Sequence, residues 1–111
     1  MSNVTANPSS IYPGGCPADN TTSAISATVN DPDDADDRIS VSFTYSFNGK
    51  VFGPFAMSPV GRHVFRGTLS QMPAPRQDTT VAISVSAKDA AGNPAKPGAT
   101  SVLLYSYCPI G

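Results

Sequence analysis

The chain has 111 residues, enough for one domain with a modest core. Its net charge is −1 and its seven Lys and Arg residues are scattered, so nucleic-acid binding by phosphate neutralisation is not expected. Eleven Pro, nine Gly and the absence of Glu disfavour helices. No signal peptide is visible, and no apolar run is long enough to span a membrane.

The N-terminal part combines a polar segment with two short strand patterns. Residues 1–10 are expected to form a flexible arm ahead of a domain that spans residues 11–111. Ile11-Tyr12 is predicted to be a short edge strand that ends at the turn Pro13-Gly14-Gly15. Residues 24–29 alternate apolar and small polar side chains, which predicts a second strand.

The clearest strand pattern covers residues 39–47, where four apolar or aromatic side chains alternate with Ser and Thr: Val41, Phe43, Tyr45 and Phe47. Asn48-Gly49 tolerates the positive φ angles of a type I′ turn and therefore predicts a hairpin. The returning strand is expected at residues 51–57, bent near Gly53-Pro54.

The C-terminal half continues with short strands. Residues 58–61 are predicted to turn, residues 63–71 to form a strand with Phe65 and Leu69 facing inward, and the Pro-containing stretch after them to be irregular. Further strands are expected at residues 79–88 and 99–108. About seven short strands separated by frequent turn signals predict an all-β, immunoglobulin (Ig)-like antiparallel sandwich.

The only two cysteines, Cys16 and Cys108, lie just before the first long strand pattern and at the end of the last one. This placement predicts a disulfide between the first and last strands, and an oxidising compartment. A bridge that closes about 92 residues would constrain the unfolded chain by roughly 4.5 kcal/mol. We therefore expect an extracellular or cell-surface protein, secreted or anchored through flanking sequence.

Residues 85–93, VSAKDAAGN, resemble the penultimate strand and following turn of bacterial extracellular Ig-like and fibronectin type III-like domains. The resemblance covers roughly residues 20–108 and implies that the first and last strands run side by side in parallel. The cysteines would then meet at one pole. The chain departs from antibody-type domains because it has no Trp and its cysteines do not join the two central strands.

An acidic loop holds five of the eight Asp residues between positions 31 and 37. In an Ig-like sandwich this loop lies at the same pole as the loop that begins at Asp89. Oxygen ligands from two loops could bind calcium, whereas the alternative is a solvated acidic turn. The candidate ligands are Asp31, Asp33, Asp34, Asp36, Asp37 and Asp89.

Catalytic machinery is poorly represented. His63 is the only His, no nucleophile motif accompanies it, and there are too few Cys and His ligands for structural zinc. Most aromatic side chains are predicted to be core: Phe43, Tyr45, Phe47, Phe52, Phe55 and Phe65. Tyr105 and Tyr107 share one face of the last strand and could form a binding surface, or could instead cover a neighbouring sheet or a domain junction.

These features predict a non-catalytic extracellular Ig-like module, a spacer or a protein- or ligand-binding domain of a larger secreted or surface-anchored bacterial protein. The alternatives are a calcium-stabilised adhesion module and a carbohydrate-binding accessory domain of a secreted hydrolase. No cofactor is expected to be required, and calcium is the one candidate. The expected partner is a protein or a cell-surface glycan, and the isolated domain is expected to be monomeric.

Overall fold

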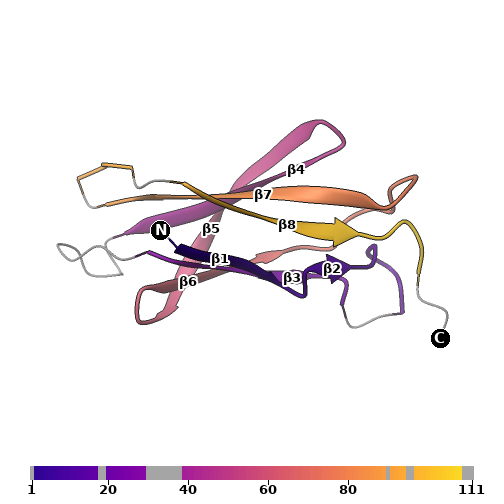
Figure 1. The fold of residues 1–111 in the computed structure, drawn as a ribbon, viewed down its shortest axis with the longest axis horizontal. Helices are drawn as coiled ribbons and strands as arrows, with labels where there is room; N and C mark the ends of the chain where they lie inside the picture. The colour runs from indigo at the N-terminus through magenta and orange to yellow at the C-terminus, as the bar shows by residue number, and fades with distance from the viewer. Residues whose placement is uncertain (1, 18–19, 30–38, 90, 95–96, 109–111) are drawn as a thin grey trace.

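The computed structural model describes residues 2–17, 20–29, 39–89, 91–94 and 97–108, and these residues form an all-β sandwich (Figure 1). No helix in this part of the chain is long and apolar enough to cross a membrane. Eight strands are present within the described residues: β1 (Ser2–Asn7), β2 (Ser10–Ile11), β3 (Ser23–Thr28), β4 (Ser40–Phe47), β5 (Lys50–Gly61), β6 (Val64–Leu69), β7 (Thr79–Lys88) and β8 (Gly98–Leu104).

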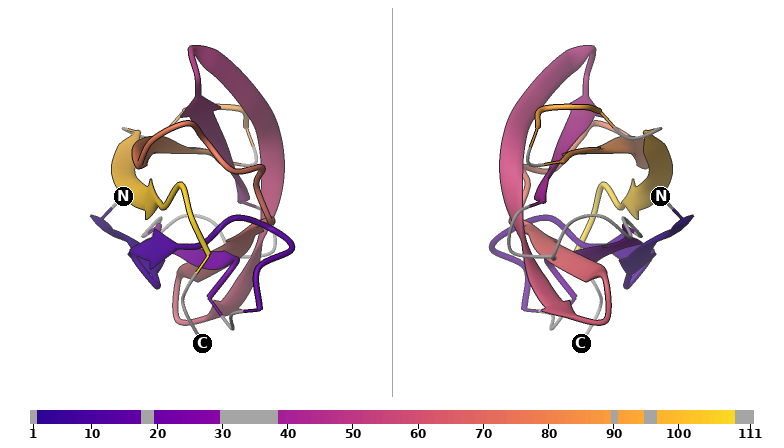
Figure 2. Two further views of the ribbon diagram at one scale, coloured as in Figure 1. Left: turned by 90° about the vertical axis from the view of Figure 1, so that its right-hand side faces the viewer. Right: turned by 90° about the vertical axis from the view of Figure 1, so that its left-hand side faces the viewer.

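The strands follow the order β1-β3-β6-β5-β4-β7-β8-β2 and form two layers. One layer contains β1, β3 and β6, and the other contains β4, β7, β8 and β2. The long strand β5 belongs to both, because residues 50–57 pair with β4 and residues 58–61 pair with β6. Figure 2 shows β5 curving from one layer to the other along one side of the sandwich.

The core lies between the layers and follows the alternation seen in the sequence. In β7 every second side chain is buried, and the same holds for β3, where Ile25 and Ala27 are fully buried. Phe65 and Leu69 both point inward from β6, as predicted, and are also fully buried. The period of two therefore identified these core faces correctly.

Both turns of the β4–β5–β6 meander use residues with positive φ. Asn48 (54°) and Gly49 (76°) form the predicted hairpin turn. The turn predicted at residues 58–61 is wrong, because β5 continues to Gly61 and the chain reverses at Arg62 (39°) and His63 (68°). Pro59 is tolerated in this part of the strand because residues 58–61 pair, among the described strands, with β6 alone. Their other edge is open and needs no N–H donor from the proline.

Residues 2–7 also differ from the flexible arm that we expected for residues 1–10. They form the edge strand β1, which pairs antiparallel with β3 and contains a register shift. Val4 and Ala6 pack against the core, so this short alternation supplies enough apolar contact to hold a segment that otherwise reads as polar.

The predicted disulfide between Cys16 and Cys108 is confirmed, with an S–S distance of 2.04 Å and a Cα–Cα distance of 5.3 Å. β2 and β8 pair in parallel, so the chain segments that follow them leave the same end of the sandwich and bring the cysteines together. β8 ends at Leu104, earlier than expected, and Tyr105 then donates its N–H to the Ile11 carbonyl at 3.0 Å.

Candidate ligand-binding site

The β4–β5 hairpin exposes aromatic side chains that the sequence pattern assigned to the core. Phe52 and Phe55 are 38% and 42% exposed, whereas Phe43 is only 1% exposed. The hairpin projects from the body of the sandwich, at the top of Figure 1, so its inner face is only partly covered by the other layer. The prediction that Phe52 and Phe55 belong to the core is therefore wrong.

A β-bulge explains why these two rings lie on one face although three positions separate them. Phe52 pairs with Tyr45 and Phe55 pairs with Phe43, so β5 has one more residue than β4 between the two pairs. Gly53, with φ of 110°, lies in this stretch. The extra residue reverses the facing of the strand and places Phe52 and Phe55 on the same side.

The four rings form a ladder that runs from the core to the surface. Ring centroids are 5.4 Å apart for Phe43–Phe55, 5.7 Å for Phe55–Tyr45 and 5.0 Å for Tyr45–Phe52. The last two pairs are stacked, with interplanar angles of 9° and 20°. The buried Phe43 ring thus fixes the position of its exposed neighbours, which is a pre-organised arrangement.

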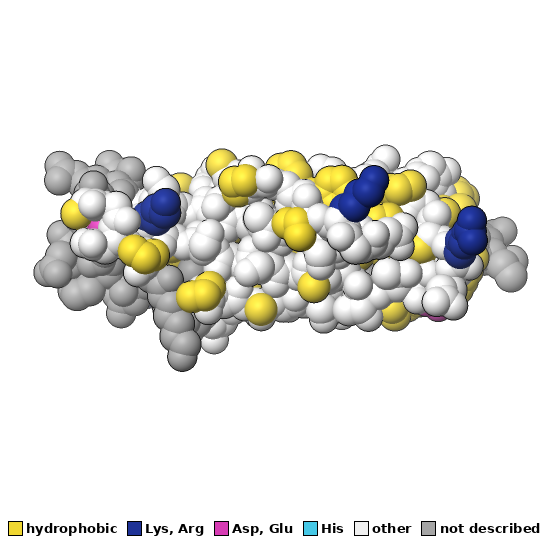
Figure 3. Space-filling model, turned by 90° about the horizontal axis from the view of Figure 1, so that it is seen from above, with side chains coloured by type: hydrophobic (Ala, Val, Ile, Leu, Met, Phe, Trp, Pro, Cys, Tyr) yellow, Lys and Arg dark blue, Asp and Glu magenta, His cyan; other side chains and the backbone are white. Residues whose placement is uncertain are grey.

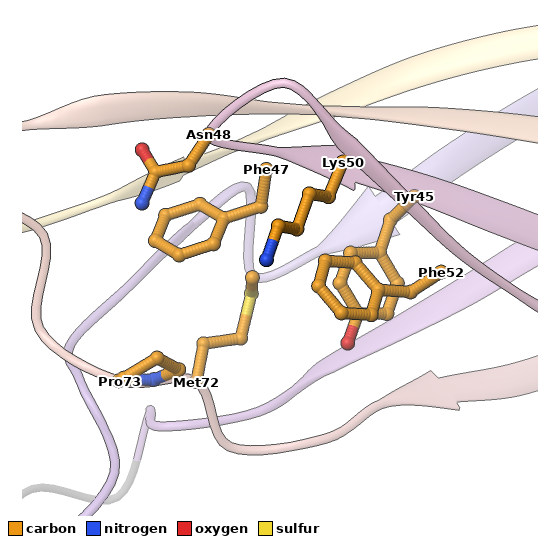
Figure 4. Close-up of a pocket in the computed structure, with 7 residues that line it drawn as sticks. All are labelled: Tyr45, Phe47, Asn48, Lys50, Phe52, Met72 and Pro73. Atoms are coloured by element: carbon orange, nitrogen blue, oxygen red, sulfur yellow. The ribbon is translucent and has the colours of Figure 1, made fainter.

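A hollow of about 310 Å³ lies beside this ladder (Figure 4). Its lining comes from β4, the hairpin turn, β5 and the segment after β6: Tyr45, Phe47, Asn48, Lys50, Phe52, Met72 and Pro73. In Figure 4 the Lys50 ammonium points into the hollow, between the Phe47 ring and the stacked Tyr45–Phe52 pair, above Met72. An apolar wall with a few convergent polar groups is typical of ligand sites.

Two further hollows adjoin the first one. A hollow of about 520 Å³ shares Asn48 with it and is otherwise lined by Arg76, Gln77 and Thr79. A small hollow of about 20 Å³ shares Tyr45 and is otherwise lined by Phe43, Phe55, Thr68 and Ser70. We call the three hollows together the hairpin groove.

The charge of the hairpin groove is positive although the chain is weakly acidic. Lys50 and Arg76 line it, and within the described residues neither forms an ion pair with a carboxylate. The nearby Asp78 instead accepts hydrogen bonds from the Ser106 N–H at 2.9 Å and the Ser106 hydroxyl at 3.0 Å. Figure 3 shows Lys and Arg side chains beside apolar ones, with Asp visible only near the two ends.

The predicted calcium site lies mostly outside the described residues, which include none of Asp31, Asp33, Asp34, Asp36 and Asp37. Asp89 is described, and its carboxylate accepts hydrogen bonds from the Ala91 N–H, the Asn93 N–H and the Asn93 side-chain amide at 3.0, 2.8 and 3.2 Å. These bonds, chiefly the one from the Asn93 backbone, hold the pKa of Asp89 below its usual value. The calcium site stays a prediction.

Tyr105 and Tyr107 do lie together, just beyond the end of β8, and Tyr12 joins them. The centroid of the Tyr12 ring is 4.8 Å from that of Tyr105 and 6.0 Å from that of Tyr107. Desolvation raises the pKa of Tyr107, and Tyr12, Asp78 and Tyr105 add to this effect. Sequence reasoning missed Tyr12, although the parallel pairing of the first and last strands would have placed it here. The use of Tyr105 and Tyr107 as a binding surface stays a prediction.

His63, the only His, occupies the turn between β5 and β6. The part of the chain that the structure describes contains no group of three or more His, Cys, Asp and Glu residues that could hold a metal ion. The arrangement with the clearest binding geometry is therefore the hairpin groove.

Sequence reasoning did not find this groove. Lys50 lies at the start of β5, whereas Met72 and Arg76 lie in the connection between β6 and β7, and only the fold brings them together. The one available signal was Gly53-Pro54 between two Phe residues, which marks a bulge that can turn both rings to the same face.

The sequence matches no protein-family model and no curated protein. The structure is similar to that of the PKD domain of an M14-like peptidase from Thermoplasmatales archaeon SCGC AB-540-F20, with a TM-score of 0.52 and 18% sequence identity. The match covers 93% of this chain and 91% of that chain. At this identity the likeness concerns the fold, and it agrees with the Ig-like β-sandwich built from the strand order.

Proposed function

We propose that this chain is a non-catalytic Ig-like module of a larger extracellular protein and that it binds a ligand through the hairpin groove. The observation that carries the proposal is the exposed, pre-organised Tyr45–Phe52–Phe55 stack. Burying exposed aromatic surface on association is favourable, and exposed apolar patches rimmed by polar residues mark interaction sites and ligand-binding grooves.

Two further observations support an extracellular location and a place within a larger protein. The Cys16–Cys108 disulfide is typical of proteins in oxidising compartments, which favours an extracellular location. The similar PKD domain is part of a peptidase, which supports a module within a larger protein. Because similar folds carry unrelated functions, the binding role itself rests on the groove.

The proposal can be tested by a ligand screen read by amide NMR on the disulfide-bonded protein. The screen would contain saccharides, short peptides and small aromatic and aliphatic acids. We expect ligands to shift the amide signals of Tyr45, Lys50 and Phe52, and we expect Phe52→Ala to weaken binding, so that the shifts need a higher ligand concentration. Shifts confined to other surfaces, or none with any compound class, would refute the hairpin groove as the binding site.

A further inference from the structure

We propose that the hairpin groove binds an acidic oligosaccharide, a chain of sugar rings that carries carboxylate or sulfate groups. The inference deepens the proposed function and rests on it, because it names the class of ligand for the same groove. Three properties of the groove lead to it: aromatic faces, a track of neutral hydrogen-bonding side chains, and two cations.

The aromatic faces match the shape of a sugar ring. A pyranose presents a flat face of C–H groups, which packs against an aromatic ring as another apolar surface does, while its hydroxyls point outward. Phe52 is 38% exposed and is held in place by stacking on Tyr45 at 5.0 Å. A ring fixed in this way loses little conformational entropy when a ligand packs on it.

The hydrogen-bonding side chains match a ligand that is rich in hydroxyl groups. Along the groove, neutral amides and hydroxyls outnumber charges: Thr68 and Ser70 lie at one end, Asn48 at the middle, and Gln77 and Thr79 at the other end. The Thr79 hydroxyl donates to the Gln77 carbonyl at 2.8 Å and can accept from a ligand, whereas the other side chains can both donate and accept, as a sugar hydroxyl does. The hollows of about 310 and 520 Å³ share Asn48, so the track suits more than one linked ring.

The cations select an acidic sugar over a neutral one. Lys50 points into the central hollow and Arg76 lines the next one. Arg offers a planar pair of donors to a carboxylate or sulfate, and Lys offers a point charge, so both form charge-assisted hydrogen bonds with such a ligand. Among the described residues, no carboxylate lines any of the three hollows to compete for them.

An acidic peptide is the main alternative, and the backbone argues against it. A peptide in extended form would gain most by adding a strand to the open edge of β5 beside residues 50–57. Gly53-Pro54 interrupts that edge with a bulge and a residue that has no N–H, and Lys50 adds a charge, features that oppose strand addition. Recognition would then depend on side chains, which favours a ligand without a strand-forming backbone.

The test compares uronic-acid oligosaccharides with neutral ones of the same linkage and length, by calorimetric titration of the disulfide-bonded protein at low and moderate salt. β-1,4-linked glucuronic acid hexamers would be matched with β-1,4-linked glucose hexamers, and galacturonic acid, mannuronic acid and sulfated hexasaccharides would complete the panel. We expect at least one acidic oligosaccharide to bind, at least about tenfold more tightly than its neutral counterpart. Its affinity should fall as salt rises.

Variants assign the binding to the groove. Lys50→Met and Arg76→Gln should each weaken acidic-sugar binding about tenfold and leave binding of the neutral sugar unchanged. Phe52→Ala should weaken both. Lys88→Met is the matched control, because Lys88 pairs with Ser40 at the far end of β4 and should leave binding unchanged.

The outcomes separate this inference from the proposed function. If neutral sugars or peptides bind the groove as well as acidic oligosaccharides do, or bind it when no acidic oligosaccharide does, the acidic-sugar assignment is wrong while the groove remains a binding site. If no compound of any class perturbs Tyr45, Lys50 or Phe52, both proposals are wrong. Acidic-sugar binding that survives Lys50→Met and Arg76→Gln together would also overturn the assignment.

Discussion

The carboxylate of Asp89 holds together the turn that follows β7. It accepts hydrogen bonds from two backbone N–H groups and from the Asn93 side-chain amide, and its pKa is lowered from 3.8. Since the folded pKa lies below the unfolded one, the ionised carboxylate stabilises the fold above about pH 4. This stabilisation is lost as the pH falls through the lowered folded pKa.

We therefore expect Asp89→Ala to lower the melting temperature at pH 7, and the difference from the parent protein to shrink below about pH 4. Melting curves followed by circular dichroism between pH 2 and 7 would measure this. Asn93→Ala, which removes one of the three donors, should have a smaller effect. A carboxyl pKa of 3.8 or higher for Asp89, measured by NMR titration, would contradict the assigned cause.

Phe65 and Phe52 should differ in how much each contributes to the free energy of unfolding. Phe65 is fully buried, so Phe65→Ala should cost about 3–5 kcal/mol of unfolding free energy. Phe52 is partly exposed and stacks on Tyr45, so Phe52→Ala should cost only about 1–2 kcal/mol. Urea unfolding of both variants would test the contrast, and equal losses would place Phe52 in the core after all.

At the scale of elements, β5 depends on its bulge. A Cβ at Gly53 would lie 2.9 Å from the Phe43 carbonyl oxygen and 3.1 Å from the Phe55 ring, at a φ of +110°. Gly92 also has positive φ, +87°, but a Cβ there would meet nothing within 4 Å. The two glycines therefore share the conformational requirement and differ in their surroundings.

The same substitution, Gly to Ala, should therefore cost more at Gly53 than at Gly92. Gly92→Ala should cost about 1–2 kcal/mol of unfolding free energy from backbone strain alone. Gly53→Ala should cost a further 1–3 kcal/mol or so, because the new methyl group must displace Phe43 or Phe55. Chemical denaturation gives both values, and the signals of Phe52 and Phe55 should move only in Gly53→Ala. Equal costs would show that the bulge adjusts without disturbing the aromatic stack.

The same element shows why sequence reasoning found the strands but not the site. Alternation identified β3 and β7, because each keeps one face in the core, and it identified β4, where Val41, Phe43 and Phe47 are buried and Tyr45 is half-buried. In β5 only Met57 is buried, and one additional residue at the bulge reverses the facing. A period of two cannot show where the register shifts, so Phe52 and Phe55 were assigned to the core.

At the scale of the whole molecule, the features that sequence reasoning missed depend on contacts between segments that are far apart in the sequence. The cysteine positions were sufficient to predict the bridge, and the Ig-like resemblance to predict the parallel first and last strands. The hairpin groove, in contrast, forms only when Met72 and Arg76 lie beside the β4–β5 hairpin, whose turn is more than twenty residues earlier in the sequence. β1 was missed for a related reason, since its few apolar side chains become informative only beside β3.

The Cys16–Cys108 disulfide should make a large contribution to the free energy of unfolding of this domain. β2 pairs with β8 through only two residues on each strand, Ser10 with Leu103 and Ile11 with Leu104, so the covalent bridge secures a short contact. The bridge links residues separated by 92 positions. Removing a native disulfide from a small domain typically costs about 2–5 kcal/mol, mainly by releasing the unfolded chain.

Reduction should accordingly lower the melting temperature by about 10 °C or more, since 1 kcal/mol corresponds to roughly 4–8 °C in a domain of this size. Calorimetry with and without reductant measures the shift, and the Cys16→Ala/Cys108→Ala double variant should melt at the reduced temperature under both conditions. Hydrogen exchange should rise first at β2 and at the end of β8. Thiol titration of the unfolded, unreduced protein should find no free cysteine, and two reactive thiols per chain would refute the bridge.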